Sequence, residues 1–310
     1  MIKNSESEKT RFTVAVLLAT YRPDSVFLEM QLKSIMEQEG VNIKLFWSDD
    51  SDSEIEYIKV QKILDKDSHI NVTSKGKKGA NQNFLHLLQS ASDLDIDFYA
   101  FSDQDDIWIS DKLKRHSKAL SEYGPRVACT HSTANIFRNN KEIEGKSRCQ
   151  NHQLETLLAE NCIQGCTMVL NRSAKNLILS VSPVGIAWYD WWIGSIISIS
   201  GTVIHMKGVD TVYRIHSSNL IGIPSKFNLI TRLMRHKNNN GFSQSQNLLK
   251  FAQSYGYQDS EKEIQIWVNG HSGALRDQIK FLIFDKKRRK NIFEDFLRRL
   301  SSIRSLNSIV

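Results

Sequence analysis

The first half of the chain alternates apolar runs of strand length with segments in which apolar residues recur at helical spacing. Such alternation predicts a mostly parallel sheet with helices on both faces. Ligands of these sheets bind beyond the carboxyl ends of the strands, so the polar residues that follow each run are the first to inspect. The expected strands are Phe12–Thr20, Ile43–Ser48, Ile70–Ser74 and Phe98–Ser102, and the expected helices are Ser25–Gln38, Ile55–Leu64 and Ala80–Ser90.

The pattern changes after Asp106. We expect a helix from Ser110 to about Tyr123, a buried helix that begins near Trp188, and, from about residue 227 onward, helices only. The apolar segment Val184–Met206 is nearly long enough to span a membrane, but Asp190 within it would cost about 2.5–3.5 kcal/mol in hydrocarbon, which favours a buried helix. Further strands are expected at Val127–Ser132, Thr167–Leu170 and within Thr202–His216, and C-terminal helices at Leu229–Arg235, Gln246–Tyr255, Glu261–Trp267, Ile279–Phe284 and Ile292–Leu306.

We place a boundary at Pro224–Ser225, which divides the chain into a flexible N-terminus (1–11), an α/β body (12–225) and a helical C-terminal region (226–310). The formal net charge of +7 lies in the last of these. Residues 226–310 hold 16 Lys and Arg against 7 Asp and Glu, whereas the rest holds 25 against 27. A near-neutral body argues against nucleic acid as the partner of the whole chain.

Composition excludes several classes of protein. With 310 residues, 40% hydrophobic side chains, 15 Gly and 4 Pro, the chain is neither collagen-like nor of low complexity. Its four cysteines, Cys129, Cys149, Cys162 and Cys166, lack zinc-ligand spacing, so we predict reduced thiols and a cytoplasmic protein. The polar N-terminus has no apolar stretch of the kind that signal peptides carry.

Three carboxylates follow the fourth expected strand, at Asp103, Asp105 and Asp106. Such a group repels itself unless a cation neutralises it, and hard cations such as Mg²⁺ favour one or two carboxylates together with phosphate oxygens. A solvated acidic loop is the alternative. The apolar strand before the group and Ile107-Trp108 after it argue against free exposure, and we therefore favour a metal site.

The acidic segment Asp49–Ser53 follows the second expected strand. One reading is a helix N-terminus whose acids complement the helix dipole, with Ser53 as the cap. In the other reading Asp50 faces a ligand. The residues alone leave both open.

Asp190 stands among Trp188, Tyr189, Trp191 and Trp192. An aromatic surround favours the neutral form of a carboxyl group, which suits a general base that accepts a proton from a hydroxyl. A structural acid at a helix start is the alternative, and local evidence favours it. Arg214 and His216 would share one face of a strand, where Arg suits phosphate and His suits phosphate or a metal.

Taken together, these stretches resemble the family 2 glycosyltransferases of the GT-A fold, and most of all bacterial polysaccharide rhamnosyltransferases. The ordered set of pieces between Phe12 and Gly222 carries the resemblance, rather than any single piece. The pieces are Ala19-Thr20-Tyr21; Ser48-Asp49-Asp50-Ser51; Gly79-Ala80 with Asn83-Phe84; Ser102-Asp103-Gln104-Asp105-Asp106-Ile107-Trp108 with Asp111-Lys112-Leu113; Gln164-Gly165-Cys166-Thr167-Met168; Tyr189-Asp190 before Trp191-Trp192; and Tyr213-Arg214-Ile215-His216 with Asn219 and Gly222.

The resemblance implies a Rossmann-like, mostly parallel mixed sheet flanked by helices, with 12–225 as the catalytic domain and a C-terminal helical extension. It implies a divalent metal (Mg²⁺ or Mn²⁺), a dTDP- or UDP-sugar donor and a polyprenyl-diphosphate-linked glycan acceptor at the cytoplasmic face of the membrane. It also implies roles for single residues: Thr20, Tyr21, Asp50, Asn83, Asp103 and Arg214 for the donor; Asp105, Asp103 and His216 for the metal; Asp190 as the base; and Trp191, Trp192 and Gln164 on the acceptor side. The chain departs from the family at Tyr189, where a His is common, at Ile215, and in lacking an Arg between Gly79 and Asn83.

This chemistry agrees with the residues. A metal would neutralise the leaving diphosphate, Asp190 would deprotonate the acceptor hydroxyl, and direct displacement would invert the anomeric carbon. Two other classes stay open. One is metal-dependent phosphoryl transfer, although its Asp nucleophile follows an early strand rather than the fourth. The other is a non-enzymatic protein that binds membrane or nucleic acid through Lys286–Lys290 beside an amphipathic stretch.

Overall fold

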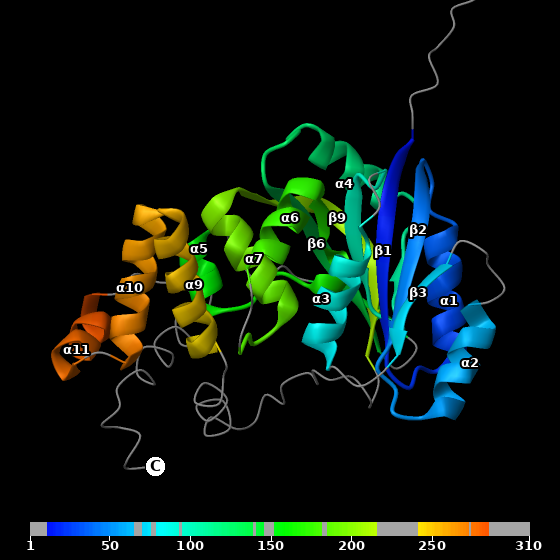
Figure 1. Cartoon of the computed structure of the whole chain (residues 1–310), viewed down its shortest axis with the longest axis horizontal. Helices are drawn as coiled ribbons and strands as arrows, with labels where there is room; N and C mark the ends of the chain where they lie inside the picture. Colours follow the sequence, from blue (N-terminus) through cyan, green and yellow to red (C-terminus); the bar gives the residue numbers. More distant parts are fainter. Residues whose placement is uncertain are drawn as a thin grey trace, which may run out of the picture.

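A mixed sheet forms the centre of the computed structural model, which describes residues 11–64, 70–75, 79–92, 95–138, 141–145, 152–181, 185–215, 241–272 and 274–284. The strand order is β3-β2-β1-β4-β8-β6-β9-β5, with β7 paired to β6 (Figure 1). The strands are β1 Phe12–Thr20, β2 Val41–Asp49, β3 Ile70–Lys75, β4 Phe98–Ser102, β5 Ile107–Trp108, β6 Ala128–Arg138, β7 Lys141–Ile143, β8 Val169–Asn171 and β9 Thr202–Arg214.

Helices cover both faces of this sheet (Figure 1). They are α1 Ser25–Met36, α2 Glu54–Leu64, α3 Ala80–Ser90, α4 Lys112–Ser121, α5 Leu154–Ala159, α6 Arg172–Ser180, α7 Tyr189–Ser200, α9 Gly241–Tyr255, α10 Gln258–Ser272 and α11 Leu275–Phe284, with a 3-10 turn at Gly165–Thr167. Strands β3, β2, β1 and β4 run parallel, whereas β8 is antiparallel to both β4 and β6, and β5 is antiparallel to β9. The predicted α/β class with a mostly parallel, mixed sheet is confirmed.

The apolar run in β1 is continuous because the strand is buried on both faces. Val14, Val16 and Leu18 face one core, which α1, α2 and α4 complete with residues such as Leu28. Alternate positions, including Leu17, face a second core under α3, α6 and α7. Burial on both faces fixes the strand register, and with it the place where each strand ends.

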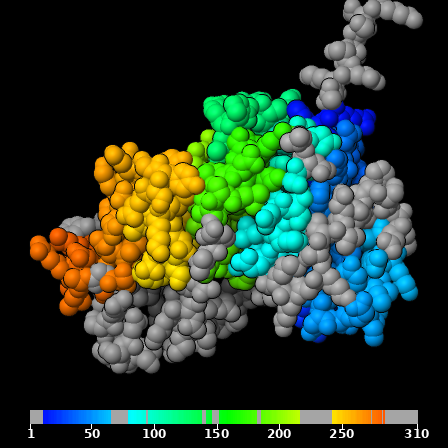
Figure 2. Space-filling model, in the orientation of Figure 1, coloured from blue at the N-terminus to red at the C-terminus, as the bar shows by residue number. Residues whose placement is uncertain are grey.

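The apolar segment around Asp190 forms the buried helix α7 and the beginning of β9. Within the described residues, no helix combines the length and hydropathy that crossing a bilayer requires. Helices α9 and α10 join the core that α7 borders, through Phe251, Ile264 and Trp267. The space-filling view shows α9, in yellow, lying directly against the green surface, with the orange α10 and α11 beyond it (Figure 2). The predicted helices Leu229–Arg235 and Ile292–Leu306, and the proposed boundary, lie outside the described residues.

Several elements differ from expectation. The helix after the acidic group begins at Lys112 and ends at Ser121, and β6 and β9 are longer than predicted because they pair in parallel along most of their length. The short elements β5, β7, α5 and α6 were not predicted. Cys129 and Cys166 are free thiols as expected, but the prediction is wrong for Cys162, which is disulfide-bonded.

Three imidazole rings meet between β6, β9 and the segment before α5. They belong to His131, His152 and His205, which we call the histidine triad, and their ring centres lie 4.3, 5.0 and 5.2 Å apart. His131 and His205 are direct partners in the parallel β6–β9 register. Only the pairing of distant strands brings these residues together.

Two histidines of the triad, His131 and His152, make stability depend on pH. Burial lowers the pKa of His131 well below its usual value and that of His152 to about 4, with neighbouring imidazoles as a smaller cause. In the unfolded chain the pKa of a histidine is about 6.5. The contribution of these two residues to the stability of the fold is therefore complete above that pH. It is lost as the pH falls toward 4, because the unfolded chain then binds more protons than the folded chain. We expect the melting temperature in metal-free buffer to fall over this range, and to fall less in His152→Gln. Equal slopes in the two proteins would contradict the assignment.

Candidate functional site

The carboxyl ends of β1, β2 and β4 bring together the polar segments that follow them. Gln104 joins two of these segments: its Oε1 accepts from the backbone N–H of Tyr21 at 2.7 Å, and its Nε2 donates to the Tyr21 carbonyl at 3.2 Å. Sequence reasoning missed this role, although Gln104 lies inside the acidic motif. The exposed ring of Tyr21 is thus held at the edge of the site.

The hydroxyl of Thr20 has two hydrogen-bond partners within the protein. It donates to Asp49 Oδ1 at 2.6 Å and accepts from Trp47 Nε1 at 2.8 Å. Asp49 also accepts from the backbone N–H and the hydroxyl of Ser51. Thr20 and Asp49 therefore shape the loop, and the buried Asp50 next to them keeps its predicted role toward the nucleotide.

Asp103, Asp106 and Cys166 converge at the end of β4. One potential ligand atom from each residue lies within 4.8 Å of those from the other two. Among the described residues, no other group of three or more His, Cys, Asp or Glu side chains comes this close together. Asp106 is fully buried, and neither of its carboxylate oxygens has a hydrogen-bond partner among those residues. Asp105, which the sequence favoured as a metal ligand, is not a member of this group. Its predicted role stays a prediction, while Asp106 is the carboxylate that the fold places against Asp103.

Burial and mutual repulsion disfavour the ionised forms of Asp103 and Asp106. Burial, and then the charges of Asp106, Asp105 and Asp190, raise the pKa of Asp103 well above its usual value. Burial and the charge of Asp105 raise the pKa of Asp106 to about 7. Carboxylate oxygens are the donors that Mg²⁺ and Mn²⁺ prefer, so Asp103 and the buried, unpartnered Asp106 fit a hard divalent cation. The Cys166 thiol is not a ligand type that these metals favour.

Lys112 is a buried cation beside the same group. Its ammonium donates to the Cys166 carbonyl at 2.5 Å and to Thr211 Oγ1 at 2.9 Å, and it lies 3.8 Å from the centre of the Trp108 ring. Burial lowers its pKa, and nearby carboxylates, including Asp106, oppose that shift. Lys112 thus offsets part of the negative charge while it holds the turn that contains Cys166.

Asp190 lies in the first turn of α7 with three N–H groups directed at it. Oδ1 accepts from Asn161 Nδ2 at 2.9 Å and from the Trp191 backbone at 2.7 Å, and Oδ2 accepts from the Gly165 backbone at 3.1 Å. These donors fix the orientation of the carboxylate at the N-terminus of α7. The side chain that the sequence placed in an aromatic surround thus has polar partners on both of its oxygens.

The turn Gln164–Cys166 connects the two acidic features. Gly165 reaches Asp190 through its N–H, and Cys166 adjoins Asp103 and Asp106. A Cβ on Gly165 would lie 1.9 Å from the hydroxyl oxygen of Tyr189, so the turn requires glycine. Tyr189 in turn stacks on Phe84 at 4.1 Å. The base candidate and the metal candidate therefore belong to one site.

Comparisons with known proteins agree with this arrangement. No family model matches the chain. The dTDP-rhamnosyl transferase RfbG of Shigella flexneri is 29% identical over 220 residues, which cover 68% of this chain and 75% of RfbG. The UDP-Glc:alpha-D-GlcNAc-diphosphoundecaprenol beta-1,3-glucosyltransferase WfgD of Escherichia coli is 27% identical over 168 residues. The match covers 53% of this chain and 62% of WfgD.

Two solved structures share the fold. TarS 1–349 of S. aureus in complex with UDP-GlcNAc has a TM-score of 0.55 at 14% identity, covering 96% of this chain and 92% of that one. The mannosyltransferase PcManGT of Pyrobaculum calidifontis, in complex with GDP-Man and Mn²⁺, has a TM-score of 0.55 at 14% identity. The match covers 97% of this chain and 88% of PcManGT. The chain is a glycosyltransferase of the GT-A fold. One of the two curated relatives, RfbG, is a dTDP-rhamnosyl transferase.

Arg214 of this glycosyltransferase supports the acidic loop. Its Nε donates to the Asp105 carbonyl at 3.2 Å, and its guanidinium lies 4.1 Å from the centre of the Phe27 ring. The predicted contact with the donor stays a prediction. Asn83 donates to the Ser48 carbonyl at 3.3 Å, while its Oδ1 is buried without a partner among the described residues. His216 lies outside those residues.

The two tryptophans after the base candidate are core residues in the glycosyltransferase. Trp192 is 0% exposed, and Trp191 is 8% exposed, with its Nε1 donating to the Leu157 carbonyl. An indole enclosed by the core cannot face an acceptor, which corrects their assignment to the acceptor side. The half-buried Gln164 keeps that assignment as a prediction.

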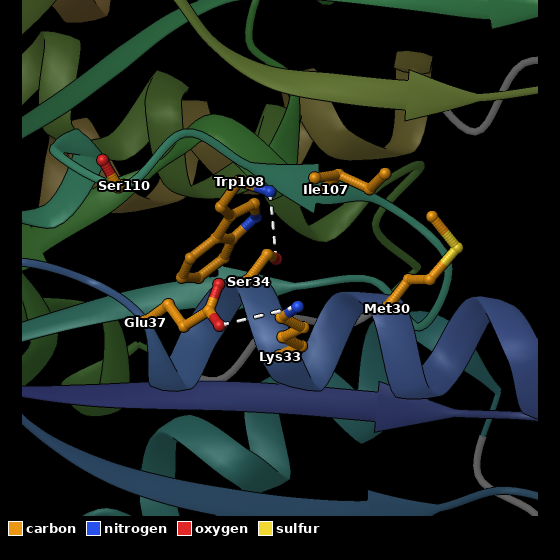
Figure 3. Close-up of a pocket in the computed structure, with 7 residues that line it drawn as sticks. All are labelled: Met30, Lys33, Ser34, Glu37, Ile107, Trp108 and Ser110. Carbon is orange, nitrogen blue, oxygen red and sulfur yellow. Dashed lines mark hydrogen bonds and ion pairs between the residues drawn. The ribbon is translucent and has the colours of Figure 1, made fainter.

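A groove of about 320 Å³ lies elsewhere on the enzyme, between α1 and β5 (Figure 3). None of the candidate site residues lines it. Across it, the Trp108 backbone N–H donates to Ser34 Oγ at 3.1 Å. Along α1, Lys33 pairs with Glu37 at 3.8 Å. The lining residues are Met30, Lys33, Ser34, Glu37, Ile107, Trp108 and Ser110. We place the candidate site at the converging carboxylates and not at this groove.

Proposed function

We propose that this glycosyltransferase moves a sugar from a nucleoside-diphosphate donor to a growing bacterial surface polysaccharide. The observation that carries the proposal is the convergence of Asp103 and Asp106 at a strand end, with the charge of Asp190 acting on Asp103. One part of this arrangement suits a cation with a diphosphate, and the other suits proton transfer from a hydroxyl. Glycosyl transfer from a nucleotide sugar needs both.

Asp103 and Asp106 would hold the divalent metal, with Asp105 and His216 as the further ligands that the motif predicts. When bound, the metal neutralises charge on the leaving diphosphate. The Mn²⁺ and GDP-Man in the PcManGT complex support a metal and a nucleotide-sugar donor for this fold. Asp50 and Thr20, at the neighbouring strand ends, would lie toward the nucleotide.

Asp190 would act as the general base. Asn161 and the Gly165 backbone orient its carboxylate, and the proton that it accepts comes from the acceptor hydroxyl. Attack by that hydroxyl on the face opposite the leaving diphosphate inverts the anomeric carbon, in the manner of a direct displacement. The charges of Asp103 and Asp106, when neutralised by metal, no longer oppose the approach of the donor diphosphate.

Rhamnose is the sugar we propose, because the RfbG relative is a dTDP-rhamnosyl transferase. The diphosphoundecaprenol acceptor in the name of WfgD supports a polyprenyl-diphosphate-linked glycan here. With such an acceptor the enzyme would work at the cytoplasmic face of the membrane, where the positive charge of the sequence 226–310 would suit anionic lipid.

A thermal-shift panel tests the donor class. We expect one nucleoside diphosphate among dTDP, UDP and GDP to raise the melting temperature in the presence of Mn²⁺, because ligands that bind only the folded state stabilise it. The shift should disappear when EDTA replaces Mn²⁺. An equal response to inorganic phosphate alone would favour phosphoryl transfer, and no response to any nucleotide would contradict the proposal.

A further inference from the structure

The histidine triad has no part in the proposed transfer reaction. His131 extends from β6 and His205 from β9, while His152 precedes α5, so three separate segments supply one ring each. His131 is 1% exposed. Both of its ring nitrogens, and Nε2 of His152, are buried without a hydrogen-bond partner in the described part of the chain. A buried polar group with no partner costs free energy, so an enclosed imidazole with two such nitrogens requires an explanation.

The spacing of the rings matches that of metal-bound imidazoles. With Zn–N bonds of about 2.0–2.1 Å and tetrahedral angles, the centres of three bound imidazole rings lie roughly 5 Å apart. The observed separations are 4.3, 5.0 and 5.2 Å. The ring nitrogens do not converge as the carboxylate oxygens and the sulfur of the Asp103 group do. Rotation of a ring about its Cβ–Cγ bond, a soft torsion in His, redirects its nitrogens and hardly moves its centre.

The three rings differ in their polar contacts. His205 Nε2 lies 3.2 Å from the hydroxyl oxygen of Thr133, a polar contact beside the triad. Neither ring nitrogen of His131 has a hydrogen-bond partner in the described part of the chain, so no protein group there competes with a cation for them.

We propose that the histidine triad, His131, His152 and His205, binds a transition-metal cation of the Zn²⁺ type. Three neutral imidazoles are a common ligand set for Zn²⁺, whereas Mg²⁺ and Mn²⁺ prefer the oxygen ligands of Asp103 and Asp106. The triad is therefore a second metal site with a different chemical preference. Its cation joins the β6–β9 pair to the segment that leads through α5 to Asn161, a partner of Asp190.

Metal titration of the purified full chain tests this site. The protein is stripped with EDTA, dialysed and titrated with Zn²⁺ against a chromophoric chelator, and with Co²⁺ while visible absorption is recorded. The variants are His152→Gln, whose ring is only half-buried, and His131→Gln. The matched control is His86→Gln, in which a half-buried histidine on α3 is replaced. Asp106→Asn removes a carboxylate of the Asp103 group and leaves the triad unchanged, so it shows which of the two sites binds Zn²⁺.

We expect tight Zn²⁺ binding and a Zn²⁺-dependent rise in melting temperature in the wild type, in His86→Gln and in Asp106→Asn. In His152→Gln the affinity for Zn²⁺ should fall more than about tenfold, because altered outer-shell partners of a metal site already cause a loss of that size and His152 is a ligand in our proposal. Its metal-free melting temperature at pH 8 should match the wild type, which shows that the variant folds. Zn²⁺ binding that is unchanged in His152→Gln and in His131→Gln, or that disappears in Asp106→Asn, would overturn the proposal.

Discussion

Replacing Asp190 by Asn is expected to lower sugar transfer about a hundred- to ten-thousandfold, the range for loss of a positioned general base. Binding of the donor nucleotide sugar should stay close to that of the wild type, because Asp190 faces the acceptor hydroxyl in our proposal. Three N–H groups hold the carboxylate in place, and an amide accepts such bonds with one oxygen only. The turnover number and the donor dissociation constant, measured separately, check this prediction.

Two further variants show whether the loss is specific. Asp97→Asn removes a carboxylate that accepts from the Thr13 backbone at the opposite end of the parallel strands, and it should leave transfer nearly unchanged. Asn161→Ala removes one of the groups that orient Asp190, and we expect an intermediate loss in turnover. Transfer at the wild-type rate in Asp190→Asn would rule out Asp190 as the base.

The second large effect is expected at Asp106. Asp106→Asn removes one of the two carboxylates that converge on the metal position, so metal-dependent donor binding should fall by more than about a hundredfold, beyond what altered outer-shell partners cause. The metal-free variant should be at least as stable as the wild type above pH 7. The pKa of Asp106 is raised to about 7, so its ionisation weakens the folded state as pH rises through that value, and Asn cannot ionise. Isothermal titration with Mn²⁺ and the nucleotide, and melting curves at pH 8, provide the two measurements.

Asp105→Asn is the matched comparison for this experiment. The motif favours Asp105 as a metal ligand, whereas the structure places Asp106 against Asp103. Loss of metal-dependent binding in both variants would mean that both carboxylates hold the metal. Full binding in Asp106→Asn together with complete loss in Asp105→Asn would contradict the assignment drawn from the structure.

Much of the fold follows from local patterns in the sequence. The run Phe12–Thr20 is apolar throughout because β1 is buried on both faces, and its end places Thr20 beside Asp49. The acidic motif after β4 identified the region of the metal candidate for the same reason. The local sequence determines where a strand ends. The residues that follow the strand are therefore placed at that end of the sheet.

Other features depend on contacts between distant segments. The two residues of β5 are a strand only because they pair with β9, more than a hundred positions later. Trp191 and Trp192 resembled an acceptor platform, but α9 and α10 complete a core that encloses both indoles. Whether Asp105 or Asp106 converges with Asp103 depends on the path of a short loop, and the histidine triad depends on the register of β6 against β9. Periodicity carries no information about such contacts.

The central claim is metal-dependent transfer of a sugar from a nucleoside-diphosphate donor at the carboxylate site. The most direct test incubates the purified chain with Mn²⁺, a dTDP-, UDP- or GDP-linked sugar, and lipid-linked glycan extracted from cells that lack this protein. Nucleoside diphosphate release and acceptor mass are followed together. We predict that dTDP-rhamnose adds one deoxyhexose to the acceptor with equal release of dTDP, and that EDTA abolishes both. No transfer from any donor, or transfer that EDTA leaves unchanged, would contradict the account.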